Sequence, residues 1–475
     1  MDPVAVQTLT LRAFFRILKN NAAPELQGYY RYCAGENIDF TQGPYKKYWR
    51  QASNEARQLT LGNELDNRKL DEILQAAHVA EENSPWVLIG GPPCQAYSLA
   101  GKARNKSKVN YIAEEDHRHF LYKEYLRIVQ KYRPSVFIME NVKGILSSNV
   151  GGKMIFQSIL SDLSDPDFAM TNITGPGYRI HSLVNQTVFR KGMSLNEIDS
   201  KDFIVKAENY GIPQARHRVF LLGIREDLLV TPETLQESSS ISVRDVICDL
   251  PALRSTLSKK PDNRDAWSVM ISEHLEDLIN LSAHNIDLQQ LNNTLRQLAE
   301  LWKFQHKKEP LISMYDSLLP KKLSQWFSDP QLKTRLNHEA RGHMSSDLRR
   351  YLYAASYAIA YGHSPKGHKE FELDGLKPNH KNWESGNFSD RFRVQVSDRP
   401  STTITSHISK DGHYYIHPDP LQCRSLTVRE AARLQTFPDN YFFQGNRTQQ
   451  FHQVGNSVPP LLANQISNIV KKLFD

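Results

Sequence analysis

The chain has 475 residues, of which 40% are hydrophobic and 23% are charged, a composition typical of a globular protein with room for about two or three domains. Lys and Arg exceed Asp and Glu by 59 to 52, a balance that mildly favours a polyanionic partner. No apolar run approaches the roughly 18 residues of a membrane span, and no charged flank precedes an apolar core at the N-terminus. We therefore expect a cytoplasmic protein without a membrane segment.

The first predicted element is a helix that begins almost at Met1. Asp2 and Pro3 have the residue types of an N-cap and of a first helical position. Apolar residues between Leu9 and Leu18 then recur at helical spacing, which predicts an amphipathic helix.

A strand–helix–strand unit is the next predicted feature. The apolar run 86–89 is closed by a Gly-Gly-Pro-Pro turn and predicts a buried strand that stops abruptly. The segment 119–132 carries one apolar stripe and predicts a helix, and the apolar run 136–139 predicts a second strand. A crossover of this length implies parallel strands. Cys94 and Glu140 therefore follow the carboxyl ends of parallel strands, where ligands bind in open α/β sheets.

The cysteines are few and far apart. No CxxC pair occurs, so neither a structural zinc site nor a disulfide framework is indicated, and we expect no metal. A cysteine taken without its surroundings is most often a small buried hydrophobe. Cys94 differs because a glycine-rich and proline-rich turn precedes it. The four cysteines are Cys33, Cys94, Cys248 and Cys423.

Two arginines precede the next predicted strand, which covers residues 219–222. If Arg216 and Arg218 are extended, their side chains project to one face. An isolated pair of this kind is commonly a solvated basic edge. Together with Cys94 and Glu140, however, the arginines form a set with its own chemistry. A thiolate can add to an electron-poor ring carbon, a carboxylic acid can protonate a ring nitrogen, and arginine can hold a carbonyl or a phosphate.

These residues lie in motifs that resemble the ordered motifs of bacterial C5-cytosine-specific DNA methyltransferases. The resemblance covers residues 86–225 and 399–466. It implies an α/β fold with a doubly wound, mostly parallel, Rossmann-like sheet and a second, target-recognition domain. The domains implied are a catalytic part over 1–225, a recognition domain over 226–398, and a return to the catalytic domain over 399–475. The motifs are GPPCQ at 91–95, ENV at 140–142, QARHR at 214–218 and GNSVPP at 455–460.

The resemblance also implies a role for each motif residue. Cys94 would attack C6 of a cytosine flipped out of duplex DNA, and Glu140 would protonate N3. Arg218 would support the base or its oxygen, and Arg216 would assist with the loop and backbone. The methyl donor would be S-adenosylmethionine. The residues implied at the cofactor are Pro93, Leu121, Asn456 and Ser457, and those implied at the DNA are Gln95, Ser98, Arg341 and Arg349.

Residues 226–398 have a different character, with a serine-rich stretch, a leucine-rich helical run and a basic segment over 320–351. The resemblance places the reading of bases in the major groove here. A solvated helical insertion is the alternative, and for Arg341 or Arg349 a structural role competes evenly with a phosphate contact. The bases that are read do not follow from this sequence.

The C-terminal part returns to regular elements. Thr427 has the type of an N-cap, and Glu430, three residues later, completes a capping-box pattern. The GNSVPP motif then opens a final helix. Outside its motif, Asn456 would read as a turn residue with a local backbone bond.

The beginning of the chain departs from the family pattern. The glycine-rich FxGxG strand that holds the cofactor in the family would lie just upstream of Asp2 and Pro3. We expect weak binding of S-adenosylmethionine unless another chain or an upstream segment supplies this strand, as with a late start, a split enzyme with a complementing subunit, or a decayed gene. Alternatives are a DNA-binding remnant without chemistry and an RNA-directed member of the family. A partner restriction enzyme is also open.

Overall fold

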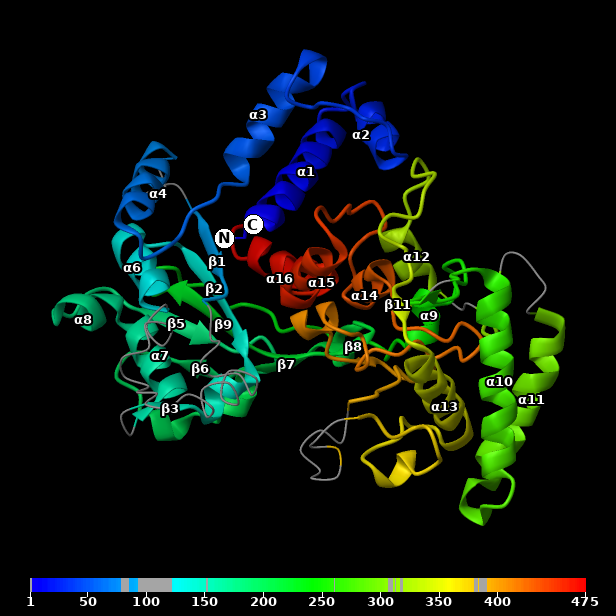
Figure 1. The fold of residues 1–475 in the computed structure, drawn as a ribbon. Coiled ribbons are helices and arrows are strands. Elements are labelled where there is room, and N and C mark those ends of the chain that lie inside the picture. The colour runs from blue at the N-terminus through cyan, green and yellow to red at the C-terminus, as the bar shows by residue number, and fades with distance from the viewer. Residues whose placement is uncertain are drawn as a thin grey trace.

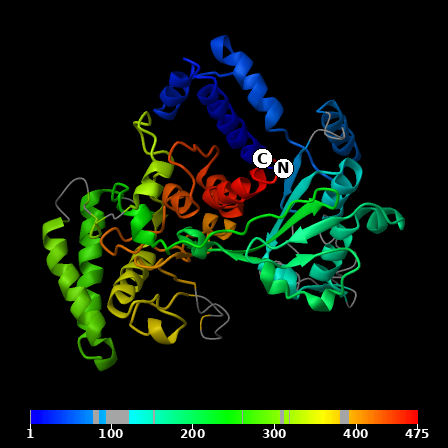
Figure 2. The ribbon, with the colours of Figure 1, turned by 180° about the vertical axis from the view of Figure 1, so that it is seen from behind.

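The computed structural model describes residues 2–77, 85–92, 122–150, 153–259, 261–305, 311, 313–316, 319–379, 383 and 391–475. Along the chain lie an N-terminal group of helices, a sheet covered by helices, and a helical region on the opposite side of the molecule (Figure 1). Seen from behind, the C-terminal helices lie between the sheet and the helical region (Figure 2). Within the described ranges, no helix combines the length and the apolar character that crossing a bilayer requires.

The main sheet has six strands in the part of the chain that is described. They are β1 (Val87–Gly90), β2 (Val136–Val142), β5 (Tyr178–His181), β6 (Val188–Phe189), β7 (Ile204–Lys206) and β9 (His217–Arg225). The order is β1-β2-β9-β5-β6, with β7 also paired to β9. Two-residue pairs outside this sheet join β8 (Gln214–Ala215) to β12 (Ser401–Thr402), β10 (Thr256–Leu257) to β11 (Gly342–His343), and β3 (Asn149–Val150) to β4 (Lys153–Met154).

Helices cover both faces of this sheet. The side chains of β2 alternate between two buried clusters, with Phe137 and Met139 on one face and Val136 and Ile138 on the other. The first face packs on α6 (Tyr122–Tyr132) and α7 (Ile155–Ser164), beside the short α8 (Pro166–Thr171). The second packs on α14 (Val428–Leu434), α15 (Arg447–Asn456) and α16 (Pro460–Lys471). The predicted α/β class, with helices on both faces of one sheet, is confirmed.

The predicted strand–helix–strand unit is also confirmed, because β1 and β2 are parallel neighbours joined through α6. Among the described strands, parallel pairing in the main sheet is confined to this pair. The pairs β2-β9, β5-β9, β5-β6 and β7-β9 are antiparallel. The connection between β7 and β9 covers residues 207–216, too short for the crossover of a dozen or more residues that parallel strands need.

The N-terminal helices form a separate aromatic cluster. They are α1 (Pro3–Asn20), α2 (Leu26–Cys33), α3 (Lys46–Glu55) and α4 (Glu64–Ala76). The predicted start of α1 is confirmed, since the Asp2 carboxylate accepts hydrogen bonds from the backbone N–H groups of Val4 and Ala5 at 2.8 and 3.1 Å. Phe14 and Phe15 of α1 are buried with Leu332 and Leu336. The N-terminal helices are thereby fixed to a distant part of the chain.

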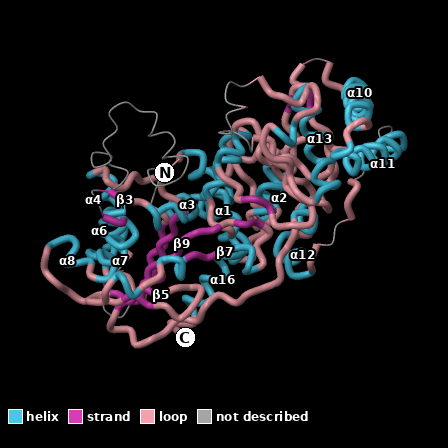
Figure 3. Tube along the Cα trace, turned by 90° about the horizontal axis from the view of Figure 1, so that it is seen from below, coloured by secondary structure: helices cyan, strands magenta, loops and turns pink. Residues whose placement is uncertain are grey.

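The helical region between the main sheet and the C-terminal helices along the chain contains α9 (Val243–Ile247), α10 (Arg264–Ser282), α11 (Gln289–Gln305), α12 (Lys321–Phe327) and α13 (Ser345–Tyr361). The hairpin of α10 and α11 lies at the end of the molecule away from the sheet (Figure 3). The buried cluster that contains this hairpin also includes Cys423, which lies much later in the sequence. Val243 of α9, by contrast, packs in the buried cluster of the main sheet. The domain boundaries at 226 and 398 stay a prediction.

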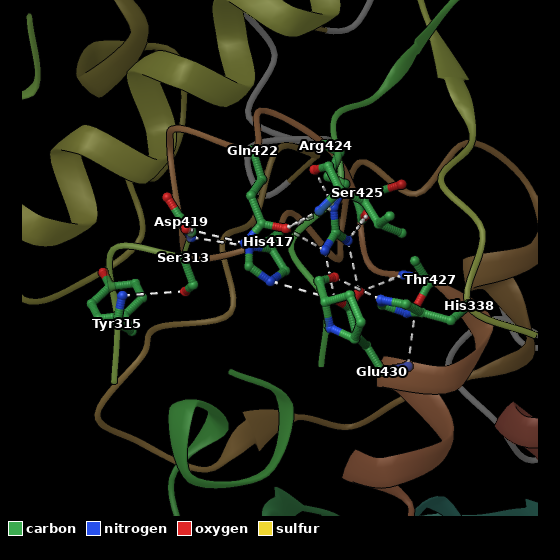
Figure 4. Close-up of polar contacts among 12 residues, drawn as sticks. Ser313, Tyr315, His338, His417, Asp419, Gln422, Arg424, Ser425, Thr427 and Glu430 are labelled. Carbon is green, nitrogen blue, oxygen red and sulfur yellow. Dashed lines mark hydrogen bonds and ion pairs between the residues drawn. The ribbon is translucent and has the colours of Figure 1, made fainter. Parts of the chain in front are cut away.

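Residues 415–430 thread between these two cores. Tyr415 and Val428 belong to the cluster of the sheet, and Ile416 belongs to the cluster of the helical region. Arg424 donates two hydrogen bonds, of 2.7 and 2.6 Å, to the carboxylate of Glu430, and both side chains are 1% exposed. A polar network surrounds this pair (Figure 4). The capping box between Thr427 and Glu430, predicted from the sequence, is present with both of its bonds.

Candidate active site

The candidate site lies where the carboxyl end of β2 meets the beginning of β9. Because these strands are antiparallel, Val142 pairs with Arg218 and Glu140 pairs with Phe220. The Arg218 guanidinium Nε lies 3.0 Å from Oε1 of Glu140, and the two side chains are 16% and 21% exposed. The structure therefore brings these two predicted residues together in a partly shielded ion pair that a ligand can still reach.

The chain after β1 runs directly against this pair. A Cβ added at Gly91 would lie 3.2 Å from Oε2 of Glu140, so a larger residue would crowd the carboxylate. The side-chain amide of Asn141 donates to the carbonyl of Pro92 at 3.5 Å, while its oxygen accepts from the backbone N–H of Val142 at 2.8 Å. Five of the predicted site residues lie outside the described residues, namely Pro93, Cys94, Gln95, Ser98 and Leu121.

Arg216 has a different set of partners from Arg218. Its guanidinium donates to the carbonyls of Ile404 at 2.8 Å and Gly455 at 3.3 Å. Only 3% of the residue is exposed, and burial, followed by the charge of Arg218, lowers its pKa to about 9. Arg216 therefore ties the start of β9 to the C-terminal glycine turn, while Arg218 reaches Glu140.

The predicted cofactor residues Asn456 and Ser457 lie at the end of α15. Asn456 is exposed, and the Ser457 hydroxyl donates to the carbonyl of Val454 at 2.8 Å. The turn packs closely on residues 405–406, because a Cβ added at Gly455 would clash with their backbone. A side chain at position 455 would therefore push the turn away from its support.

Two buried glutamines join this arrangement although sequence reasoning did not single them out. Gln214 donates to Oε1 of Gln435 at 2.7 Å, and Gln435 donates to the hydroxyl of Ser457 at 3.1 Å. Gln214 is the first residue of the QARHR motif at 214–218, so the sequence did indicate that it lies near the candidate site. Gln435 follows α14 and carried no local signal, because its partners are distant in sequence.

The predicted DNA-contacting arginines have partners within the protein. Arg341 donates to the carbonyls of Lys410 and Ile408, both at 3.0 Å. Arg349 lies 2.9 Å from a carboxylate oxygen of Asp277 and donates to the carbonyl of Asp374 at 3.1 Å. Contact between these arginines and DNA stays a prediction.

The described cysteines are poorly suited to nucleophilic chemistry. Cys33, Cys248 and Cys423 are all buried. Burial raises the pKa of the Cys33 and Cys248 thiols to about 12 and raises that of Cys423 as well. A thiol with a raised pKa supplies little of the reactive thiolate.

Comparison with known proteins agrees with the geometry. Residues 32–472 match the model of the C-5 cytosine-specific DNA methylase family. The type II methyltransferase M.Bpa9945I of Bacillus paralicheniformis is 31% identical over 493 residues, which cover 99% of this chain and 92% of that protein. The type II methyltransferase M.DdeI of Desulfomicrobium norvegicum is 26% identical over 403 residues, which cover 82% of this chain and 73% of that protein. The chain therefore belongs to the C-5 cytosine-specific DNA methylase family.

Proposed function

We propose that this protein transfers a methyl group from S-adenosylmethionine to C5 of cytosine in a specific site of double-stranded DNA, through a covalent bond between Cys94 and the base. The ion pair of Arg218 and Glu140 carries this proposal. It presents a carboxyl group and a guanidinium together at the end of β2, and Pro92, two residues before Cys94, adjoins Asn141 there.

The chemistry requires a nucleophile because C5 of cytosine is not reactive by itself. The Cys94 thiolate forms a bond to C6, the C5–C6 π electrons shift to make a C4–C5 double bond, and N3 takes a proton from Glu140. C5 then becomes nucleophilic and would take the methyl group that bound S-adenosylmethionine supplies, with S-adenosylhomocysteine as the leaving group, while N3 returns its proton to Glu140. Loss of the C5 proton to a base and breaking of the S–C6 bond release methylated cytosine and the free thiolate.

Cys94 is the proposed nucleophile for a reason beyond its motif. The thiols of Cys33, Cys248 and Cys423 are buried with raised pKa values, so none of them supports a reactive thiolate.

Arg218 holds the carboxylate of Glu140 for its contact with the base. Glycine at position 91 keeps this carboxylate uncrowded, because a Cβ there would lie 3.2 Å from Oε2 of Glu140. Because C5 lies inside the duplex stack, the base must be flipped out, at a cost of a few kcal/mol.

We place the methyl donor beside Asn456 and Ser457. The exposed amide of Asn456 can both donate and accept hydrogen bonds, as the amino, carboxylate and hydroxyl groups of S-adenosylmethionine require. The turn that presents this amide is held from behind by Arg216, which favours one fixed orientation. The names of the relatives support a role beside a restriction enzyme.

Methyl transfer from radiolabelled S-adenosylmethionine to duplex DNA tests the proposal. We expect labelled DNA at a concentration of S-adenosylmethionine high enough to compensate for weak binding, and a loss of about a hundredfold or more with Glu140→Gln, as for removal of an acid catalyst. DNA carrying 5-fluorocytosine cannot lose a proton from C5, so it should trap a denaturation-resistant complex with the chain but not with Cys94→Ser. Labelled structured RNA and unlabelled DNA would contradict the DNA substrate, and DNA binding without transfer or trapping would favour a DNA-binding chain without chemistry.

A further inference from the structure

A line of buried amides connects the arginine motif to the C-terminal turn. Gln214 is 0% exposed and uses its whole side chain internally. Its amide nitrogen donates to Oε1 of Gln435 at 2.7 Å and to the carbonyl of Leu434 at 3.2 Å, while its oxygen accepts from the backbone N–H of Ile404 at 2.8 Å. Gln214 is therefore fixed on both sides, two residues before Arg216.

Gln435 continues the line to the turn and is likewise 0% exposed. Its amide nitrogen lies 2.9 Å from the carbonyl oxygen of Val454, 3.0 Å from that of Ser457 and 3.1 Å from the Ser457 hydroxyl. A single side chain thus meets the oxygens on both sides of Gly455 and Asn456. The Gln435 side chain therefore acts on the shape of the turn through the hydrogen bonds that it donates to these oxygens.

Arg216 provides a second link between the same two segments, through its bond to the carbonyl of Gly455. Residues 214–218 form the arginine arm, in which Arg218 pairs with Glu140. Hydrogen bonds therefore connect this arm to the turn that presents Asn456. Burying a polar side chain is costly unless its donors and acceptors find partners, and both glutamine amides find them, whereas the Nε of Arg216 has no hydrogen-bond partner. The hydrogen bond between the side chains of Gln214 and Gln435 joins two segments that are 221 residues apart in the sequence.

We propose that Gln435 is a positioning residue, which holds the 454–457 turn in the shape that binds S-adenosylmethionine and couples that turn to the arginine arm. The proposal rests on the proposed function, because it takes Asn456 and Ser457 as cofactor residues. Gln435 touches neither the base nor the cofactor in this scheme. Its loss acts through the geometry of the turn.

The primary variant is Gln435→Met, which keeps the length of the side chain and removes its amide. Loss of donors to the turn should raise the dissociation constant of S-adenosylmethionine about tenfold in calorimetric titration without DNA. The KM for S-adenosylmethionine should rise by a similar factor, with the KM for DNA unchanged. Hydrogen exchange of the 454–458 backbone amides should be faster in Gln435→Met than in the unaltered protein, both measured without ligands.

A second variant and a control separate positioning from general damage. Gln435→Glu keeps the shape and the acceptor for Gln214 but cannot donate to Val454 and Ser457, so it should weaken cofactor binding in the same way. Asn292→Leu removes another buried amide, which donates to Ile279 and Ser282 in the helical hairpin. This control should lower the unfolding temperature and leave both the cofactor affinity and the exchange of 454–458 unchanged.

The outcomes distinguish this proposal from the proposed function. If the unaltered chain binds no S-adenosylmethionine, the cofactor assignment fails, and the exchange of 454–458 still decides whether Gln435 holds the turn. Unchanged exchange in Gln435→Met, or equal weakening of cofactor and DNA binding, would overturn the positioning role.

Discussion

In the proposed function, the contact between Arg218 and Glu140 most directly shapes the chemistry. The pair is partly shielded from water, so the attraction between the charges is stronger than at an open surface. Arg218 also donates to the carbonyl of His217 at 2.9 Å, which limits its freedom to follow another partner. The guanidinium therefore orients the carboxyl group instead of merely balancing its charge.

The first prediction concerns this orientation. We expect Arg218→Met to lower kcat for methyl transfer by about tenfold to a hundredfold, because Glu140 loses the partner that aligns it. The KM for S-adenosylmethionine should change little. Steady-state kinetics measure both values. Arg225→Met is the matched control, since Arg225 lies on the same strand and pairs with Asp227 at 2.7 Å, and it should leave kcat unchanged.

Candidate site residues that lie within a short, recognisable motif could be predicted from the sequence. Glu140 and Arg218 were predicted together, and the structure places them in contact. The internal partners of Arg341 and Arg349 were not predictable, because a guanidinium in a basic segment gives no sign of the carbonyl it will meet. The role of Gln435 was not predictable either, because its hydrogen-bond partners are distant in the sequence.

At the scale of elements, the end of α15 packs on the segment that follows β12. The contact leaves no room for a side chain at Gly455, and the neighbouring atoms belong to the backbone of Thr405 and Ser406. Backbone cannot move aside as a flexible side chain can. The turn can therefore keep its shape only with glycine at this position.

The second prediction follows from this contact. Gly455→Ala should destabilise the protein by about 1–3 kcal/mol, as overpacking does in well-packed cores, and should weaken S-adenosylmethionine binding. Chemical unfolding and calorimetric titration measure the two effects. Gly342→Ala serves as the comparison, because its nearest neighbour is the Thr256 hydroxyl at 3.1 Å. Equal effects of both variants on cofactor affinity would contradict the prediction.

Element positions were predictable where a pattern repeats, and pairing directions were not. An uninterrupted apolar run identified the strand after Arg218 but carries no sign of its direction. The short connection between β7 and β9 sets that direction, and it brings the beginning of β9 to the end of β2. The parallel pairing of β1 and β2 followed from the length of the crossover between them.

At the scale of the whole molecule, residues 415–430 connect the core of the sheet to the core of the helical region. The Arg424–Glu430 pair lies at the centre of the polar network in this connection (Figure 4). Arg424 also donates to the carbonyl of Leu253 at 3.1 Å, which adds a third segment to the junction. The relative placement of the two cores therefore depends on a buried charge pair.

The third prediction is that Arg424→Met destabilises the protein by about 3–5 kcal/mol, because it leaves the Glu430 carboxylate buried without its partner. Urea unfolding measures the loss. The double variant Arg424→Met with Glu430→Gln removes both charges and should be less destabilised than the sum of the single variants. Additive effects would show that the two side chains do not act as a pair.

The fourth prediction concerns pH. Burial lowers the pKa of His343 and His417 to about 3 and that of His181 to about 4. Below an unfolded-state pKa of about 6.5, the unfolded chain takes up protons that the folded protein refuses, so stability falls from about pH 6.5 toward pH 4. Burial raises the pKa of Asp419, which acts in the opposite sense.

Each of these histidines should cost roughly 2 kcal/mol of stability at pH 5 relative to neutral pH. Urea unfolding at pH 7.5, 6.0 and 5.0 measures the trend. His181→Phe removes a buried ring whose Nε2 has no hydrogen-bond partner, so this variant should show a shallower dependence on pH. The same slope in both proteins would rule out a contribution from His181.

The bond from Gln214 to Gln435 spans 221 residues, and the bond from Arg216 to the carbonyl of Gly455 in the C-terminal turn spans 239 residues. A nascent chain on the ribosome therefore exposes Arg216 and Gln214 long before their partners have been translated. Contacts so distant in sequence also form slowly, since a large loop must close first. We expect newly made protein to gain methylating activity only after residues 435–457 have left the ribosome and met the arginine arm.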